Sequence, residues 1–410
     1  MRIGLFSDTY PPYVNGVSTS VFMLKKALEK KGHQVYVVTV NNENMSYKFD
    51  EDDTVIRIPG VPIGIYDYRL TNIYPLRAIN IIKKWNLDVM HTHTEFGIGT
   101  FARIISKQLK IPIIHTYHTM YEDYVHYITK GYFDKSSKKI VEYLTMFYCE
   151  KTVNELIVPT NKTYKLFKEK YEFDRNINII PTGIEIERFY VENVDAKKIQ
   201  EISKKLNILK NDFVMMYVGR VASEKSIDVL IENQVEILKT CPHSKLIIVG
   251  DGPDAESYKE LANKLKIEEN VIFTGKIPWV EMPIYYQLAN IFVTASTSET
   301  QGLTVIEAMA AGIVPVCIKD ESFINTVVDG LNGRIFEDKK EHIRIINELY
   351  NDREKLMKLA KQARLNAEVH SSKYYAEAVL DVYKRAIDDQ EEKKKHGIFS
   401  KISNKFKKKD

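Results

Sequence analysis

The sequence predicts an α/β fold of two doubly wound, Rossmann-like parallel-sheet domains that face a cleft. Short apolar segments alternate with segments of helical periodicity along most of the 410 residues, and this alternation favours parallel strands joined by helical crossovers. The length exceeds that of one ordinary domain, and the two alternating halves join near residues 182–211. Ligands are expected at the carboxyl ends of the strands, as in other open α/β sheets.

Six apolar segments predict the strands of the first domain: 2–7, 33–40, 54–58, 88–93, 111–118 and 176–185. A helix is expected over 17–31, because apolar residues recur at helical spacing from Val17 to Leu28 before Gly32. Further helices are expected over 69–85, 137–150 and 160–171. Basic residues border the apolar flank of the 69–85 segment, so a core-facing helix and an interfacial helix are both open.

The second domain repeats the pattern, with a helical stretch after each of five strands: 212–220, 245–253, 270–276, 290–296 and 312–318. A last helical stretch over 372–388 has no strand after it, and we expect it to return to the first domain. The predicted divisions are 1–185 for the first domain, 186–371 for the second, 372–390 for the bracing helix and 391–410 for a tail.

Composition indicates a globular protein, with 44% hydrophobic and 28% charged residues. The three cysteines, Cys149, Cys241 and Cys317, have neither metal-ligand nor disulfide spacing, so we expect reduced core residues of a cytoplasmic protein. The chain opens directly on a strand, which predicts no signal peptide. No apolar run reaches the ~20 residues of a membrane-spanning helix.

Residues 298–316, SETQGLTVIEAMAAGIVPV, carry the strongest functional pattern. Glu299 and Glu307 are separated by seven residues, and Gly302 breaks that interval just before a helical run. The amides of Gly302, Leu303 and Thr304 would form a helix N-terminus, which favours an anion. Acceptors for hydroxyls would then flank a phosphate site, which is the polarity pattern of a sugar nucleotide. The alternative is a strand–loop–helix packing unit with solvated glutamates.

Two cations follow the strand that opens the second domain. Arg220 and Lys225 flank a turn, where they could grip a diphosphate from two sides and stabilise it as a leaving group. Solvated surface cations are the alternative. Gly250 and Gly275 end two other strands, and we interpret them as turn residues first and ligand contacts second.

The first loop ends in Asn15-Gly16-Val17 at a helix start, where Gly16 would let the backbone approach a phosphate. A structural turn glycine is an equal alternative. The loop lacks the G-x-G-x-x-G spacing of a dinucleotide site, which argues against an oxidoreductase.

Histidines gather in the first half. His91 and His93 would share one face of a strand, but no further ligands lie at convincing spacing, so no metal site is predicted. His118 follows a strand end and precedes Tyr121 and Tyr124, which suits it to bind a sugar hydroxyl or orient an acceptor. A hydrogen-bonded structural histidine is the alternative.

The charge distribution points to an anionic surface. Residues 1–180 carry a net charge of +5, residues 181–390 of −6 and residues 391–410 of +5. The tail has a basic amphipathic pattern that could hold the protein at an anionic membrane. Its contact residues would be Lys393, Lys394, Lys395, Phe399, Lys401, Lys405, Phe406, Lys407, Lys408 and Lys409. A solubilising or nucleic-acid-attracting tail is the alternative, and we predict no nucleic-acid partner.

Together, NGV at 15–17, the Arg220/Lys225 pair, the E-x7-E interval and the His118 segment resemble a family 4 glycosyltransferase of the GT-B fold. Within that family, the segments HTHTEFGIGTFAR, IIHTYHTMYEDYVHYI and SETQGLTVIEA are similar to bacterial 1,2-diacylglycerol 3-α-glucosyltransferases. The resemblance covers nearly the whole chain apart from the tail. One departure is Asn15, where the family usually has glycine.

The resemblance implies that the second domain binds UDP-glucose and that the first binds the acceptor, diacylglycerol. Glu299 would contact the transferred sugar and Glu307 the ribose hydroxyls. The amides at 302–304, with Arg220 and Lys225, would bind the diphosphate. From the first domain, Gly16 would close over the phosphates, and His118 would meet the donor sugar near the acceptor, with Tyr121 and Tyr124 on the acceptor side.

The resemblance also implies retention of the anomeric configuration, with the departing phosphate oxygen accepting the acceptor's proton. No covalently bound cofactor is expected, and dependence on a divalent metal is open, with Mg²⁺ as an activator only. The expected location is cytoplasmic and peripheral, on the inner face of the plasma membrane. Three alternatives are open: a soluble or polymeric glycan acceptor, a nucleotide-sugar epimerase of the same fold, and a non-catalytic sugar-nucleotide sensor.

Overall fold

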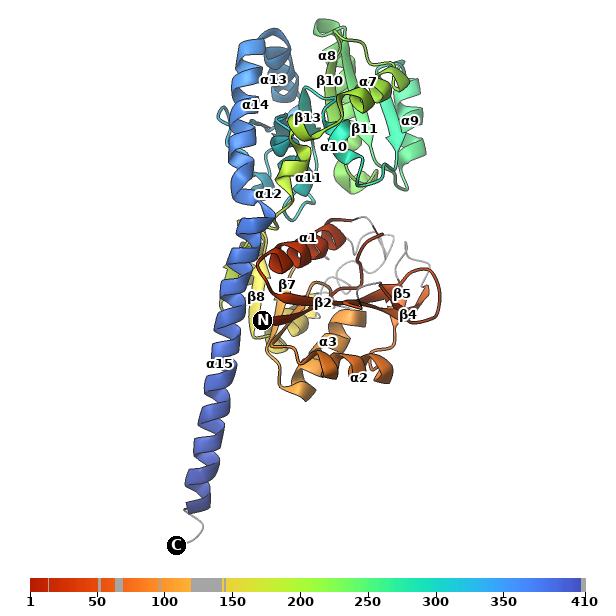
Figure 1. Cartoon of the computed structure of the whole chain (residues 1–410). Helices are drawn as coiled ribbons and strands as arrows, with labels where there is room; N and C mark the ends of the chain where they lie inside the picture. Colours follow the sequence, from red (N-terminus) through yellow and green to blue (C-terminus); the bar gives the residue numbers. More distant parts are fainter. Residues whose placement is uncertain are drawn as a thin grey trace. The chain divides into compact units, whose positions relative to one another are not determined.

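The computed structural model describes residues 1–13, 15–50, 53–62, 69–95, 97–118, 142–143 and 145–406. The chain divides into two compact units (Figure 1). The first comprises Met1–Gly183 and Ser372–Asp410, and the second comprises Ile184–Ser371. Each unit contains one sheet whose central strands are parallel, so the predicted class of two doubly wound α/β domains is confirmed.

In the described part of the first unit, nine strands form one sheet in the order β3-β4-β2-β1-β6-β7-β8-β9, with β5 paired to β4. Seven of them run parallel, and β3 and β5 pair antiparallel with β4. The strands are β1 (Arg2–Phe6), β2 (Gln34–Asn41), β3 (Lys48–Phe49), β4 (Val55–Pro62), β5 (Arg69–Thr71), β6 (Val89–Thr92), β7 (Ile113–Thr116), β8 (Glu155–Val158) and β9 (Ile177–Ile179).

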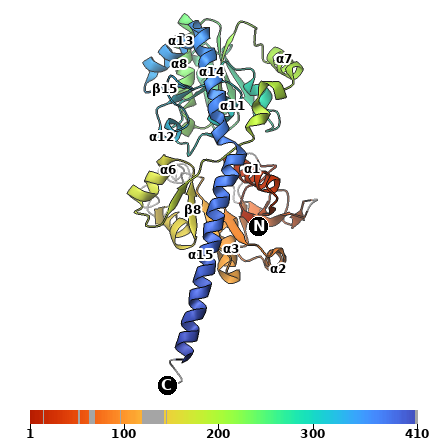
Figure 2. The same cartoon turned by 60° about the vertical axis from the view of Figure 1, so that its left-hand side comes forward.

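Helices join these strands and cover the sheet. They are α1 (Gly16–Lys30), α2 (Leu76–Trp85), α3 (Gly97–Leu109), α6 (Asn161–Lys165) and the π-helical turns η1 (Phe147–Lys151) and η2 (Leu166–Lys170). The long helix α15 (Ser372–Phe406) also belongs to this unit (Figure 2). Its residues Tyr375, Val379 and Tyr383 share a core cluster with Val21 and Leu24 of α1, so α15 is anchored by apolar packing.

The segment expected to form one helix over 69–85 is instead strand β5 followed by helix α2. Pro75 explains the start of α2, because proline lacks a backbone N–H and disfavours helical geometry in the residue before it. Ile79, Ile82 and Trp85 are buried, which gives this helix a core-facing side. Leu76, on the same predicted flank, is exposed.

The second unit has a six-stranded, fully parallel sheet in the order β12-β11-β10-β13-β14-β15. Its strands are β10 (Phe213–Val218), β11 (Ser244–Val249), β12 (Val271–Gly275), β13 (Ile291–Thr294), β14 (Val314–Ile318) and β15 (Arg334–Phe336). The order reverses between β10 and β13. At such a switch point the loops after two neighbouring strands diverge and leave room for a ligand.

The helices of the second unit are α7 (Ala196–Lys205), α8 (Ile227–Thr240), α9 (Ala255–Lys264), α10 (Met282–Tyr286), α11 (Leu303–Ala310), α12 (Glu321–Ile324), α13 (Lys339–Asn351) and α14 (Arg353–Ala367). Short 3₁₀ turns complete it: η3 (Ile186–Phe189), η4 (Val191–Asn193), η5 (Ser223–Lys225) and η6 (Glu368–His370). One apolar cluster lies on each side of the sheet; the cluster that includes Tyr286, Val305 and Ile306 packs α10 and α11 against it.

Candidate active site

The switch point of the second sheet brings together two loops that carry predicted site residues. The loop after β10 contains Arg220 and Lys225, and the loop after β13 contains Glu299. Lys225 Nζ lies 2.5 Å from Glu299 Oε1 and 3.2 Å from Ser298 Oγ. Ser298 Oγ in turn donates to the Glu224 carbonyl oxygen at 3.0 Å. The two loops are therefore tied to each other by an ion pair and a hydroxyl.

Arg220 lies in the same loop but its guanidinium pairs with the Glu224 carboxylate. Tyr217, the residue before the end of β10, holds this loop in place, because its buried hydroxyl donates to the Arg220 carbonyl oxygen at 3.1 Å. Burial raises the pKa of Tyr217 well above its ordinary value, and the nearby charges of Glu299 and Glu224 raise it further. Arg220, Lys225, Glu224 and Glu299 thus form one charged cluster around a neutral tyrosine.

Helix α11 begins next to this cluster. Gly302 is its N-cap residue, with φ +73°, and no side chain caps the helix. A Cβ at this glycine would lie 2.6 Å from Phe323 Cε1, so both the conformation and the packing require glycine. Within the part of the chain that the structure describes, no side-chain cap is recorded at the first amides of α11, those of Leu303 and Thr304, which form the anion-favouring end of the helix dipole.

Glu307 lies one turn into α11, within an apolar environment. Its Oε2 accepts a hydrogen bond from the Tyr286 hydroxyl at 2.8 Å. Burial raises the pKa of Glu307 to about 7, while the Tyr286 hydrogen bond and the positive charge of Arg188 act in the opposite direction. Arg188 is fixed by its own contacts, with its guanidinium 3.4 Å from the Trp279 ring centroid and a 2.8 Å hydrogen bond to the Trp279 carbonyl oxygen.

Gly250 and Gly275 lie together at the ends of β11 and β12, where the Gly250 N–H donates to the Gly275 carbonyl oxygen at 3.1 Å. A Cβ on Gly250 would lie 1.8 Å from the Gly219 carbonyl oxygen, so the close approach of two backbones requires this glycine. The Gly250 amide is engaged within the protein. These contacts give both glycines a turn role.

In the first unit, Gly16 is exposed and is the first residue of α1. Asn15 is the N-cap residue, with φ −156°, and its Oδ1 accepts from the Ser18 N–H at 2.7 Å. This extended φ is open to any residue. Asparagine in place of the usual family glycine therefore fits the backbone and adds a helix cap.

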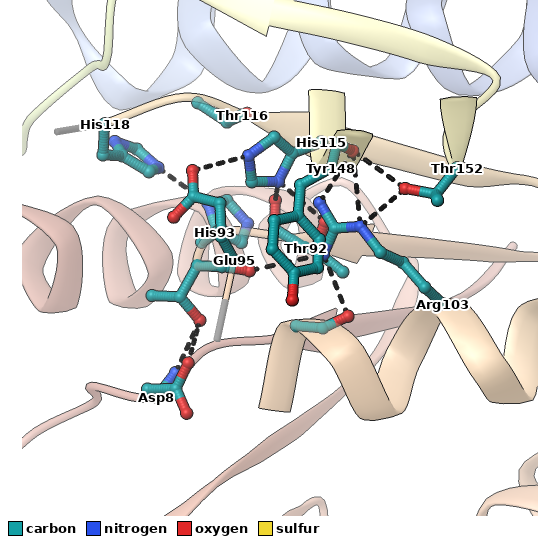
Figure 3. Close-up of polar contacts among 12 residues, drawn as sticks. Asp8, Thr92, His93, Glu95, Arg103, His115, Thr116, His118, Tyr148 and Thr152 are labelled. Carbon is teal, nitrogen blue, oxygen red and sulfur yellow. Dashed lines mark hydrogen bonds and ion pairs between the residues drawn. The ribbon is translucent and has the colours of Figure 1, made fainter. Parts of the chain in front are cut away.

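The first sheet has its own switch point between β1 and β6, and polar side chains cross it (Figure 3). Thr94 Oγ1 donates to Asp8 Oδ2 at 2.5 Å and accepts from the Asp8 N–H at 3.0 Å. Asp8 Oδ1 accepts from the Ile98 N–H at 3.0 Å, at the start of α3. Asp8 therefore joins three elements at this edge of the sheet.

His118 meets His93 at the carboxyl ends of β7 and β6 (Figure 3). His93 Nδ1 lies 2.9 Å from His118 Nε2, and the rings stack with centroids 5.2 Å apart. Burial lowers the pKa of His118 to about 3, and it lowers the pKa of His93 well below its ordinary value, so both rings are neutral at pH 7.

The tautomers of this pair follow from the hydrogen-bond network. The second ring nitrogen of His93, Nε2, is buried without a hydrogen-bond partner among the described residues. An unpaired buried N–H is rarer than an unpaired acceptor, so we assign the proton of His93 to Nδ1, where His118 Nε2 accepts it. His118 then carries its own proton on Nδ1. It is assigned as a hydrogen-bond donor and not as a general base.

His91 is held by the protein through both ring nitrogens, with Nδ1 2.7 Å from Tyr383 Oη and Nε2 2.7 Å from Thr116 Oγ1. These contacts give His91 a structural role that ties α15 to the sheet. His91 lies in β6 and His93 directly follows its last residue, Thr92; their ring centroids lie 4.1 Å apart.

Within the described residues, one group could hold a metal ion: Glu95, His115 and Cys149, whose ligand atoms lie within 4.8 Å of one another. His115 already has protein partners, with Nδ1 3.0 Å from the Thr92 carbonyl oxygen and Nε2 2.9 Å from Glu95 Oε1. Burial raises the pKa of the Cys149 thiol well above its ordinary value. Hydrogen bonding alone accounts for the Glu95–His115 pair.

Tyr121 and Tyr124, expected on the acceptor side, lie outside the described residues, as do Lys407, Lys408 and Lys409 of the tail. Lys393, Lys394 and Lys395 are exposed on α15. The tail positions from Phe399 to Phe406 continue the same helix. None of the helices in the described part of the chain combines the length and apolar composition that a bilayer crossing needs.

Sequence reasoning missed four residues that hold the site together: Glu224, Ser298, Tyr286 and Arg188. Glu224 lies four positions after Arg220 and directly before Lys225, so a search for charge pairs around the predicted cations could have found it. Tyr286 and Arg188 reach Glu307 from distant parts of the sequence. A single sequence carries no signal for those contacts.

At one edge of its sheet the second unit thus presents cations, the first amides of α11 and two carboxylates. Glu299 is ion-paired with Lys225, whereas Glu307 is buried and has a raised pKa. Lys225 and the α11 amides can bind an anionic phosphate. Glu299 pairs with Lys225 through one oxygen and can accept from a hydroxyl, and Glu307 can do the same. This combination suits a ligand that carries both phosphate and hydroxyl groups.

Two family descriptions match the chain in tandem. Glycosyltransferase Family 4 matches residues 14–188, and Glycosyl transferases group 1 matches residues 198–366. The boundary between the matches falls close to the start of the second unit.

The chain is similar along most of its length to two proteins named alpha-monoglucosyldiacylglycerol synthase. The one from Acholeplasma laidlawii is 37% identical over 401 residues, which cover 96% of this chain and 99% of the relative. The one from Streptococcus pneumoniae is 39% identical over 338 residues, which cover 82% of this chain and 75% of the relative.

Solved structures share the fold at low sequence identity. Anabaena Alr3699/HepE in complex with UDP-glucose superposes with a TM-score of 0.71 at 17% identity, covering 93% of this chain and 99% of that one. Sucrose-phosphate synthase from Thermosynechococcus elongatus gives a TM-score of 0.73 at 19% identity, covering 94% and 99%. These likenesses extend through both units.

Proposed function

The chain belongs to glycosyltransferase family 4, and from this premise we propose that it moves glucose from UDP-glucose to 1,2-diacylglycerol with retention of the anomeric configuration. The names of the Acholeplasma laidlawii and Streptococcus pneumoniae relatives support a glucosyl group and a diacylglycerol acceptor. The UDP-glucose complex of the Anabaena protein supports the donor. The product would be monoglucosyldiacylglycerol.

The single observation that carries the proposal is the Lys225–Glu299 pair at the switch point of the second sheet, beside the start of α11. Lys225 and the α11 amides would bind the diphosphate, with Arg220 alongside. Glu299 would accept hydrogen bonds from hydroxyls of the transferred glucose. Glu307 would accept from the ribose.

In the proposed reaction, the bond between the anomeric carbon and the UDP oxygen breaks as the acceptor oxygen bonds to the same face of that carbon. The hydroxyl proton of diacylglycerol passes to the departing phosphate oxygen. Lys225 stabilises the charge that develops on this oxygen. His118, assigned as an N–H donor, would orient a hydroxyl without removing its proton.

The test is transfer by the full chain from radiolabelled UDP-glucose to vesicles that contain diacylglycerol, with chromatography of the lipid product and NMR of its anomeric configuration. We expect one α-linked glucolipid. Label that appears only in a water-soluble glycan would show that the acceptor is a glycan and not diacylglycerol. Conversion of UDP-glucose to another UDP-sugar in the absence of an acceptor would indicate an epimerase. Donor binding without turnover would indicate a sensor.

Variants of the central pair test the site assignment. We expect Lys225→Met and Glu299→Gln each to lower kcat/KM by roughly 100-fold or more, since each removes an interaction with the leaving group or the transferred sugar. Lys319→Met is the matched control, because Lys319 Nζ also lies 2.5 Å from a carboxylate, that of Glu337, in an exposed pair of the same unit. Equal activity of all three variants would disprove the assignment.

A further inference from the structure

We propose that Tyr286 is a positioning residue for the nucleotide: its hydroxyl holds the Glu307 carboxylate as an acceptor for the ribose hydroxyls of the donor. This inference rests on the proposed function, because it takes Glu307 as the ribose-binding carboxylate. Tyr286 acts through Glu307 and has no assigned contact with the substrate itself.

The geometry of Tyr286 leaves its hydroxyl one preferred direction. The side chain is fully buried in the apolar cluster of α10 and α11, and its ring meets Phe189 edge-on at 5.5 Å. The hydroxyl oxygen lies 2.8 Å from Glu307 Oε2 and 3.2 Å from the Thr304 carbonyl oxygen. It has one proton to give. The carboxylate is the closer acceptor and the charged one, so it receives that proton.

Glu307 needs such a donor because its surroundings otherwise favour the neutral acid. Only 8% of the residue is exposed, and α14 covers α11 with the apolar residues Ala363 and Ala367. In the described structure, the other group that favours its negative charge is Arg188, from η3. A protonated carboxyl would give up acceptor capacity that two ribose hydroxyls require. The Tyr286 hydrogen bond works against that protonation and fixes the carboxylate's rotamer.

A purely structural role for Tyr286 makes a different prediction. The ring fills the core, and Tyr286→Phe keeps the ring while it removes the hydroxyl. If Tyr286 only packs, this change affects every ligand of the site equally. If it positions Glu307, the loss appears only with ligands that carry the ribose hydroxyls.

The experiment is calorimetric titration of the full chain at pH 8 with UDP and with 2′,3′-dideoxy-UDP. We expect the unmodified protein to prefer UDP. Tyr286→Phe should weaken UDP binding on the order of tenfold and leave binding of the dideoxy nucleotide unchanged. Glu307→Gln should also reduce the preference.

Tyr285→Phe is the matched control, because Tyr285 neighbours Tyr286 in α10 and its hydroxyl is not bonded to Glu307. It should change neither affinity. A Tyr286→Phe protein that still prefers UDP as strongly as the unmodified one would overturn this inference and leave the proposed function intact, as would equal losses for both nucleotides. An unmodified protein that binds neither nucleotide would instead overturn the proposed function, and the inference with it.

Discussion

Glu307 combines a functional role with a cost in stability. In the unfolded chain its pKa is near the ordinary value of 4.5, and burial raises the pKa to about 7 in the folded protein. The folded state therefore binds more protons than the unfolded state between these two values. The contribution of Glu307 to stability falls as pH rises through this window, since ionising the buried group opposes folding.

We predict that Glu307→Gln makes the protein more stable at pH 8 while weakening UDP binding. The gain should approach roughly 3 kcal/mol at pH 8 and vanish below about pH 4.5, because burial raises the pKa from 4.5 to about 7 and one pKa unit corresponds to about 1.4 kcal/mol. Denaturant unfolding across this pH range measures it. Glu337→Gln, in an exposed ion pair of the same unit, serves as the control for exchanging a glutamate for glutamine. Parallel pH profiles for the unmodified and Glu307→Gln proteins would contradict the prediction.

The sequence predicted site residues whose role follows from their own place after a strand. It did not predict residues whose role depends on a contact with another side chain. Arg220, Lys225 and Glu299 were expected at one sheet edge because each follows a recognisable strand. Tyr286 looks like any apolar helix position, since its function depends on one oxygen meeting Glu307. Arg188 looks like a surface cation until its stacking on Trp279 is known.

Among the elements, the turns after β11 and β12 provide a matched pair of glycines. Both have positive φ, +139° at Gly250 and +70° at Gly275. A Cβ on Gly250 would lie 1.8 Å from the Gly219 carbonyl oxygen, whereas a Cβ on Gly275 would have no atom within 4 Å. The first position therefore combines backbone strain with a collision, and the second has strain alone.

We predict that Gly250→Ala destabilises the second unit by about 2–4 kcal/mol and Gly275→Ala by about 1–2 kcal/mol. Urea unfolding of the full chain, followed by a probe in the second unit, would measure both. Equal destabilisation by the two changes would show that the backbone near Gly219 moves to accommodate the added methyl group at little energetic cost.

Element boundaries also mark where sequence patterns stop being informative. Most of the parallel strands were predicted because continuous apolar runs alternate with helical segments, and this class of fold is confirmed. β8 and β15, which are four and three residues long, are parallel strands that the sequence pattern did not predict. Helix α15 was expected to end near residue 388, but it continues to Phe406; the lysine-rich tail contains no proline, and Gly397 is its only strongly helix-disfavouring residue.

At the scale of the whole molecule, charge is separated along the chain. The segments 1–180 and 391–410 each carry +5, and residues 181–390 carry −6. The first unit contains both basic segments, because α15 returns the end of the chain to it. A protein that glucosylates a membrane lipid, as we propose, needs its acceptor-binding unit at the bilayer. A basic first unit and an acidic second unit would orient it on an anionic leaflet.

We predict that residues 391–410 contribute a large share of this attachment. Each lysine near an anionic surface is worth about 1 kcal/mol, and the tail holds eight. Deleting 391–410 should sharply lower the fraction of protein that sediments with phosphatidylglycerol-containing vesicles, and added salt should lower it in the full chain. Changing the eight lysines to glutamine tests charge at constant length, and Phe399→Ser with Phe406→Ser tests apolar insertion. If neither the deletion nor added salt lowers vesicle binding, the tail does not contribute to membrane attachment.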